Sequence, residues 1–321
     1  MVAKSRNTQF DLFIPLMRDL PLKDQRETME RPFFSLQKRK RLKPIEYKSP
    51  DGDVWVKVEA VPAYGMATIW DGDILIWAAS ALNRLKAEGR NDIPRELKTT
   101  AYDLLRSIQR DTGGKGYVDL KAALDRLATT TIFTSIRAKR GRDSRFSWLD
   151  SWDVEVDPVT EKPIALRITL SNWVYEGIIS EKSVLTMHPD YFQLSGGLER
   201  ALYRIARKHA GDQETGWTCR VNLLHDKTGS DSAPKEFSRM LRKIIENNDL
   251  PEYDLSFVTA GDGSQAVHFI RRSAAERAQA RAEIAAEDLS RARREREDRR
   301  VAEVDGRGDL WINRRVSPPE S

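Results

Sequence analysis

The chain has 321 residues, a length that suits two ordinary domains, and its 40% content of hydrophobic residues is too high for a chain that stays disordered. It has no apolar stretch of membrane-spanning length and no pattern of a secretory leader, and its single cysteine, Cys219, excludes an internal disulfide. These features predict a protein of the cytoplasm with no membrane partner. The net charge is only +5, but the cations fall in clusters, which favours contact with phosphates.

The first part of the chain predicts a hairpin followed by helices. Residues 1–44 are expected to form a loosely ordered basic segment, and two β-rich runs, 45–47 and 54–58, then flank a Pro-Asp-Gly turn. Apolar residues at helical spacing predict three helices after the hairpin: one from about 74 to 88, one over 97–108 that stops at Gly113-Gly114, and one from about 119 to 127.

Directly after the third helix comes β-branched sequence that is typical of strands. Residues 131–136 predict a strand, the basic loop 137–145 follows, and residues 146–156 and 164–170 predict two more strands. Three helices followed by a β-hairpin are the order of a winged helix. In that fold the third helix enters the major groove of DNA, and the hairpin contacts the flanking backbone.

The second part of the chain repeats this order. A helix over 198–209, a short element at 221–224 and a helix over 234–247 precede strands at 253–259 and 265–271, which flank a Gly-rich turn. We therefore predict an α+β fold with two tandem winged-helix domains, 45–180 and 181–272. The Ala-, Arg- and Glu-rich residues 273–321 are expected to form a solvated helix or a partly disordered tail.

The helix over 234–247 has the pattern of a base-reading helix. Phe237, Leu241 and Ile244 fall on one side, and cations fall nearly opposite. Arginine can pair bidentately with guanine, whereas lysine and serine can hold phosphates. A solvated amphipathic helix would look the same, but the hairpin that follows favours DNA reading. The base-reading candidates are Lys235, Ser238, Arg239, Arg242 and Lys243.

A second group of cations is expected to contact phosphates. It consists of Lys121, Arg126, Arg137, Lys139, Arg140, Arg142, Arg200, Arg204, Arg207, Lys208, Arg271 and Arg272. The third helix of the first domain is nearly balanced in charge. That domain therefore either contacts DNA with less specificity or mainly serves dimerisation.

Enzyme motifs are missing from the sequence. It contains no G-x-x-x-x-G-K-[ST] phosphate loop, and its four histidines show no metal-ligand spacing with each other or with Cys219. The pair His268 and Arg271 matches the H-x-x-R of tyrosine recombinases, but no tyrosine follows Tyr253 to act as the nucleophile. We therefore expect no catalytic activity, no metal and no cofactor.

Three stretches carry a resemblance to a known family. They are 64–71 (YGMATIWD) running into 74–77 (ILIW), 122–127 (AALDRL) followed by TTT and later by Ile136-Arg137, and 198–209 (LERALYRIARKH). Together they resemble the replication initiator protein A family of bacterial plasmids, over roughly residues 10–272. The resemblance implies binding to repeated sites in double-stranded origin DNA, local opening of the DNA, and recruitment of the host replication initiator and helicase machinery.

The resemblance also implies a monomer–dimer equilibrium in which the dimer represses its own gene. Phe33, Phe34, Trp55 and the hairpin that follows are the apolar material expected at the dimer contact. One alternative is a dimeric winged-helix transcriptional repressor with no replication role, which would use the same surfaces. Another is an interaction scaffold, which predicts no salt-dependent binding to any duplex.

Overall fold

The computed structural model describes residue 14, the ranges 21–138, 143–160, 163–180, 183–213 and 215–272, and parts of 286–296. The chain divides into two compact units, 1–271 and 272–321. In the second unit the described residues between 286 and 296 are helical and exposed. None of the described helices is long and apolar enough to cross a membrane.

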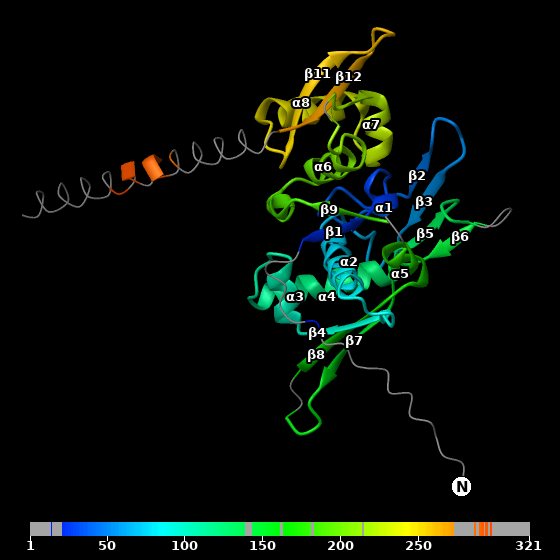
Figure 1. Cartoon of the computed structure of the whole chain (residues 1–321), viewed down its shortest axis with the longest axis vertical. Coiled ribbons are helices and arrows are strands. Elements are labelled where there is room, and N and C mark those ends of the chain that lie inside the picture. The colour runs from blue at the N-terminus through cyan, green and yellow to red at the C-terminus, as the bar shows by residue number, and fades with distance from the viewer. Residues whose placement is uncertain are drawn as a thin grey trace, which may run out of the picture. The chain divides into compact units, whose positions relative to one another are not determined.

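The first unit contains two repeats of one arrangement, and Figure 1 labels all of their elements except β10 (Trp217–Arg220). In the first repeat a helix, a strand and two helices precede a hairpin. These elements are α2 (Gly72–Ala87), β4 (Glu96–Thr99), α3 (Ala101–Ser107), α4 (Gly114–Thr129), β7 (Leu149–Val156) and β8 (Pro163–Leu170). The three strands form an antiparallel sheet in the order β4-β8-β7.

The second repeat has the same order of elements, except that two strands of another sheet intervene before the hairpin of the first repeat. They are α6 (Gly197–His209), β10 (Trp217–Arg220), α7 (Val221–Thr228), α8 (Pro234–Asn247), β11 (Tyr253–Thr259) and β12 (Gln265–Arg271). Their sheet has the order β10-β12-β11, so in both repeats the first strand pairs with the last. The duplicated architecture inferred from the sequence is therefore present in the topology.

The basic loop 137–145 does not belong to the hairpin of the first repeat, contrary to the sequence-based prediction. It follows β5 (Thr131–Thr134) and leads into β6 (Ser144–Phe146), and these strands join β2 (Ile45–Lys48) and β3 (Trp55–Glu59) in a separate sheet of order β2-β3-β5-β6. The run 146–156 is broken because the Trp148 side chain turns fully into the core. The hairpin of the first repeat is β7–β8, in which Val156 at the end of β7 pairs with Pro163 at the start of β8.

The helix expected over 97–108 is also divided. Leu97 lies on β4, where its side chain is buried and its backbone pairs with β8. The helix itself, α3, begins after Thr100, whose side-chain oxygen accepts a hydrogen bond from the Asp103 backbone N–H at 2.9 Å. Gly113, expected to end this helix, instead precedes α4 as its N-terminal cap residue.

Residues 21–44, expected to be loosely organised, contribute β1 (Leu22–Gln25) and α1 (Arg26–Met29). β1 pairs with β9 (Val184–Met187), which follows α5 (Asn172–Ile179) and precedes the 3-10 helix η1 (Pro189–Gln193). Phe33 and Phe34 are 1% and 4% exposed, and Phe34 stacks on Trp148 with ring centroids 4.6 Å apart. The prediction that these two rings are free for a dimer contact is wrong, because they belong to a core that runs from Ile14 to Phe269.

Candidate nucleic-acid interface

The helix α8 forms where the sequence predicts it. Pro234 is its first residue, where a fixed φ suits a helix and no N–H is missed. Its end is set by Asn248, which adopts a left-handed φ of 52°. The Asn248 side chain accepts from the Leu255 backbone N–H at 2.8 Å and donates to Asp254 at 2.9 Å. Asn248 thereby fixes the orientation of α8 relative to β11.

One face of α8 is buried and the opposite face is cationic. Phe237 and Leu241 are fully buried, and Met240, Ile244 and Ile245 pack against the core. All five base-reading candidates lie together on the other side. Lys235, Arg239, Arg242 and Lys243 are exposed there, and Ser238 is partly exposed. The structure therefore collects these side chains on one solvent-facing surface, which we call the α8 face.

Within the α8 face, Arg239 forms a two-pronged ion pair with Glu236 at 2.9 and 2.6 Å. This contact raises the pKa of Arg239 and lowers that of Glu236. The two side chains are 67% and 46% exposed, so the pair is solvated and a competing acceptor can replace the carboxylate at little cost. The Ser238 hydroxyl donates to the Pro234 carbonyl at 2.9 Å.

The β11–β12 hairpin differs from the expectation in where its cations lie. Arg271 was assigned to phosphate, but it lies at the open end of the hairpin, opposite Tyr253. Its guanidinium contacts Glu252 at 2.6 Å and also Asp212. These contacts join the end of β12 to neighbouring carboxylates, with which a phosphate at Arg271 would have to compete. Arg272 follows it and is partly exposed.

The turn of this hairpin carries an acid rather than a base. Asp262 accepts hydrogen bonds from the hydroxyl and the backbone N–H of Ser264, and these with Arg220 bring its pKa to about 2. The Arg220 guanidinium lies 2.8 Å from the Asp262 carboxylate and is 53% exposed. The cation at the hairpin turn is therefore Arg220, which the sequence analysis missed because β10, the strand that ends there, was not expected.

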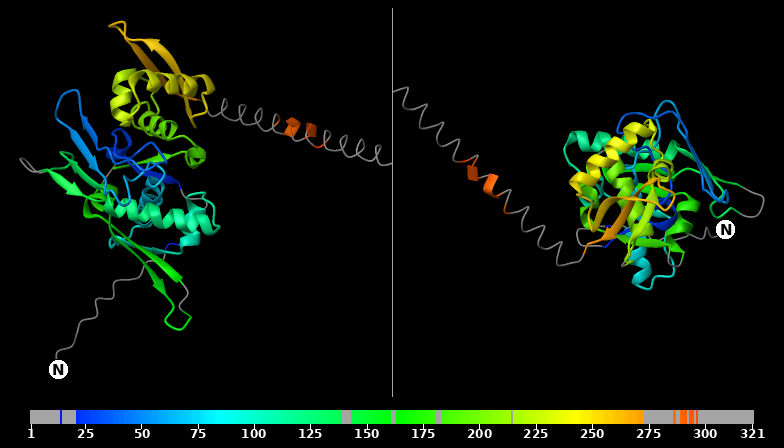
Figure 2. Two further views of the ribbon diagram at one scale, coloured as in Figure 1. Left: turned by 180° about the vertical axis from the view of Figure 1, so that it is seen from behind. Right: turned by 90° about the horizontal axis from the view of Figure 1, so that it is seen from above.

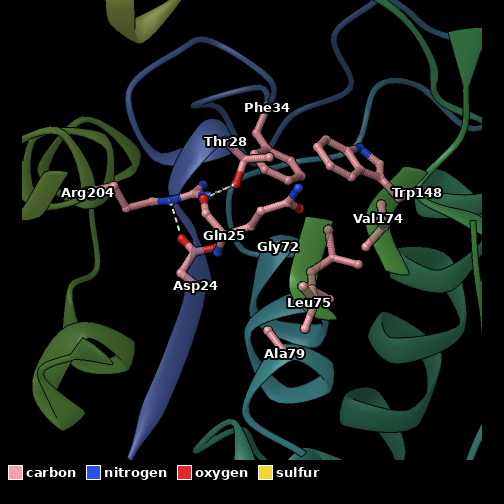
Figure 3. Close-up of a pocket in the computed structure, with 11 residues that line it drawn as sticks. Asp24, Gln25, Thr28, Phe34, Gly72, Leu75, Ala79, Trp148, Val174 and Arg204 are labelled. Atoms are coloured by element: carbon pink, nitrogen blue, oxygen red, sulfur yellow. Dashed lines mark hydrogen bonds and ion pairs between the residues drawn. The ribbon is translucent and has the colours of Figure 1, made fainter. Parts of the chain in front are cut away.

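The arginines of α6 are buried rather than available to phosphates. Arg200 is 3% exposed, and its guanidinium lies 2.7 Å from the Asp73 carboxylate and donates to the Leu194 and Phe192 carbonyls at 2.7 and 2.9 Å. Arg204 is 5% exposed and lies 2.8 Å from the Asp24 carboxylate. Figure 3 draws this ion pair as a dashed line. The phosphate assignment of both residues is corrected, because carboxylates from distant parts of the chain already hold them.

Two further cations, Arg126 on α4 and Arg137 after β5, are likewise engaged within the fold. Arg126 holds Asp71 with two hydrogen bonds of 2.7 and 2.8 Å, which ties α4 to the start of α2. Arg137 lies 3.8 Å above the Trp173 ring and 2.9 Å from Glu27, and burial lowers its pKa. Both side chains are about one quarter exposed, so their main role is to connect elements within the fold rather than to bind phosphate.

The remaining phosphate candidates fall into two groups. Lys121 is exposed on α4, and Lys208 and Arg207 are partly exposed at the end of α6, where Arg207 donates to the Thr186 carbonyl at 2.7 Å. Lys139, Arg140 and Arg142 lie outside the described residues. Among the described residues, no group of His, Cys, Asp or Glu is arranged to hold a metal ion.

Comparison with solved structures defines the fold class. The chain is similar to a crystal structure of domains 2 and 3 of RctB, with a TM-score of 0.53 and 12% identity, over 74% of this chain and 94% of that one. A second crystal structure of RctB domains 2–3 aligns with a TM-score of 0.50 and 11% identity, over 74% and 95%. These likenesses show that the chain shares the mixed α/β fold of those domains.

Sequence comparison then identifies the family. The profile of Replication initiator protein A matches residues 23–255. A protein of Wigglesworthia glossinidia brevipalpis named "Putative replication protein" is 32% identical over 234 residues, which cover 72% of this chain and 82% of that protein. The chain therefore belongs to the replication initiator protein A family, as the three sequence stretches predicted.

Proposed function

We propose that this replication initiator family member binds double-stranded origin DNA sequence-specifically, with each repeat acting as a winged helix and α8 reading bases in the major groove. The observation that carries the proposal is the α8 face: four exposed cations lie opposite a buried apolar stripe on a helix that Asn248 fixes to the following hairpin. A projecting helix with exposed Arg and Lys fits the width of the major groove and the acceptors of guanine.

The hairpin β11–β12 contributes backbone contacts in this proposal. Arg220, next to the hairpin turn, is the cation placed to meet a phosphate beside the groove. A phosphate would compete with Asp262 for Arg220, much as a guanine would compete with Glu236 for Arg239. Both exchanges replace one solvated ionic contact with another, so neither leaves a buried charge uncompensated. The proposed activity needs no catalytic group, metal or cofactor of its own.

The first repeat is proposed to contribute the dimer surface. On β7–β8 the side chains of Val154, Val156 and Ile164 are 46%, 50% and 46% exposed, and they continue the row of Leu166 and Ile168, which are buried. A row of apolar side chains that continues from the core onto the exposed surface is typical of a protein–protein contact. We propose that a second copy covers this row, and that the dimer represses its own gene while the monomer initiates.

The decisive experiment combines footprinting with a plasmid assay. The purified chain should protect repeated sites in the DNA beside its own gene. Its affinity should fall steeply with salt, with each phosphate contact contributing about −0.9 to the slope of log K against log salt. A flat salt profile would contradict the docking. The gene supplied in trans should support replication of a plasmid that carries the protected DNA. Protection without replication would instead identify a transcriptional repressor with the same fold.

A further inference from the structure

The sheet β2-β3-β5-β6 has an outer face that the proposed duplex contacts do not use. Residues alternate along each strand, so Val56, Val58 and Ile132 turn inward and are 1% exposed or less. Their neighbours Trp55 and Phe133 turn outward and remain partly exposed. Figures 1 and 2 show the two hairpins of this sheet side by side, with β3 and β5 at its centre.

The two aromatic rings lie on adjacent central strands. The register pairs Phe133 with Lys57 across β3 and β5, which places Trp55 diagonally next to Phe133. Diagonal neighbours of a sheet are about 7–8 Å apart, within the reach of large aromatic side chains. An open hollow of about 320 Å³ lies beside Trp55, and its walls include Lys48 and Glu46. The outer face thus presents two flat apolar surfaces with space next to one of them.

Cations stand next to both rings. Lys48 is paired with Trp55 in the register of β2 and β3 and is exposed. Arg145 is paired with Phe133 in the register of β5 and β6, and its guanidinium lies 5.2 Å from the centre of that ring. Lys57, between the rings, is held by Glu59 at 2.7 Å. Each ring therefore has a cation directly opposite it on the neighbouring strand.

From this arrangement we propose that the outer face of the β2-β3-β5-β6 sheet binds single-stranded nucleic acid, with bases stacked on Trp55 and Phe133 and phosphates held by Lys48 and Arg145. Aromatic rings on a cation-flanked surface bind unpaired bases, because every base has a face that can stack. The bases of a duplex are already stacked on each other, so a flat sheet gains nothing from them. A protein partner fits less well, because lysine and glutamate are depleted at the centres of protein interfaces.

The test measures binding of the full-length protein to a fluorescent strand of about 15 thymidines, a length within the usual site sizes of such surfaces. Trp55→Leu and Phe133→Leu keep an apolar side chain but lose the ring, and each is expected to weaken binding about 5- to 100-fold. Trp55→Phe and Phe133→Tyr keep a ring and should restore most of the affinity. Tyr64→Leu removes an exposed ring outside the sheet and should change nothing.

Further measurements separate the contribution of the bases to the affinity from that of the phosphates. An abasic strand with the same phosphates should bind the wild type about as weakly as thymidines bind the Leu variants. A uridine strand of equal length reports whether a 2′-hydroxyl is accepted. Arg239→Ala should leave strand binding unchanged, whereas the Leu variants should leave duplex binding unchanged, so this site and the proposed duplex site can fail separately.

Two outcomes would overturn the proposal. One is binding of the thymidine strand by both Leu variants within twofold of the wild type. The other is a change in sedimentation of the Leu variants that accounts for their loss of binding, which would assign the face to a contact between proteins. Thermal unfolding of each variant shows that the chain remains folded, and the ring-keeping variants cover the case in which a Leu variant does not fold.

Discussion

The helices α6 and α8 have arginines at similar spacing, yet the fold uses them in opposite ways. In α6, Arg200 and Arg204 lie one turn apart and are 3% and 5% exposed. In α8, Arg239 and Arg242 are also one turn apart, but both are exposed. The difference lies in the partners: Asp73 and Asp24 meet the α6 arginines in the interior, whereas Arg239 meets only the exposed Glu236.

This contrast shows what a row of cations on a helix means. A row becomes a binding surface only where no carboxylate from elsewhere in the fold reaches it. Where one does, the same arginines hold elements together, and their removal leaves a buried charge without compensation. In this protein α6 joins the second repeat to α2 and β1, and α8 is left to face solvent.

The largest expected effect is on folding and comes from α6. Arg200→Ala should lower the free energy of unfolding by about 3 kcal/mol, because the 1%-exposed Asp73 then keeps only part of its compensation, from Arg110 at 3.0 Å. Urea unfolding followed by circular dichroism measures this change. Arg207→Ala, on the same helix but partly exposed, is the control and should cost about 0.5 kcal/mol or less. Equal stability of the two variants would show that burial of an arginine beside Asp73 does not make it a structural residue, and the contrast with the exposed arginines of α8 would lose its basis.

The next effect is on DNA binding and comes from α8. Arg239→Ala should cost about 1–3 kcal/mol of specific binding and relax the preference at one base position. Its free energy of unfolding should stay within about 0.5 kcal/mol of the wild type. Selection from randomised duplexes measures both the affinity and the preference. The matched control is Arg84→Ala, since Arg84 forms a comparable exposed ion pair with Glu88 on α2; a similar loss there would show that only total charge matters.

A smaller effect is expected at the turn of the second hairpin. Arg220→Ala should weaken binding to all duplex sequences about equally and lower the salt slope by about one unit, because a phosphate contact carries no sequence information. Titrations at several salt concentrations measure the slope. Arg271→Ala sharpens this prediction: Arg271 contacts the 6%-exposed Glu252, so its loss should appear in thermal unfolding rather than in the slope.

The smallest effect is a pH dependence at the end of α6. His209 stacks on Trp217 and lies 3.0 Å from Glu30, with Lys208 and Lys227 nearby; burial lowers the pKa of His209, although Glu30 opposes the change. A histidine with a lowered pKa in the folded state adds stability above its ordinary value of 6.5 and loses it as the pH falls further. His209→Gln should therefore flatten the pH profile of unfolding below pH 6.5. An unchanged profile would show that a group other than His209 causes the pH dependence of unfolding.

Glu30 adds a second, more acidic part to the same profile. Burial alone would raise its pKa, but the hydrogen bond from His209 and the charges of Arg31 and Lys208 bring the value to about 2. Because the ordinary value is 4.5, the stability that this group contributes is complete above pH 4.5 and disappears as the pH falls towards 2. Glu30→Gln should remove that component and enlarge the histidine component, because the carboxylate that opposes the lowering of the His209 pKa is then lost.

Local signals explain what the sequence predicted well. The bounds of α8, β11 and β12 matched because a proline start, an Asn-Asn end and a Gly-rich turn mark these elements within a few residues. The exposed cations of α8 followed from the same periodicity. The family also followed from contiguous stretches, and the profile match over 23–255 confirms it.

The missed features depend on distant partners. β4 and β10 have four residues each and become strands by pairing with β8 and β12, far along the chain. Arg200 pairs in the interior with Asp73, 127 residues away, and no pattern in the local sequence predicts such a pair. Likewise, the break between β6 and β7 follows from the place that Trp148 takes among the rings of Phe33 and Phe34. Tertiary contacts, rather than propensity, decided these positions.

The pairing of β1 with β9 has a consequence for how members of this family can exchange parts. β1 supplies both a strand partner and Asp24, the carboxylate that holds Arg204 on α6. The support of the second repeat is therefore split between residues 22–25 and residues beyond 183. A hybrid gene that joins the front of one relative to the back of another at a single crossover would combine a strand and a carboxylate that did not evolve together. Recombinants that keep both segments from one parent should be the ones that survive.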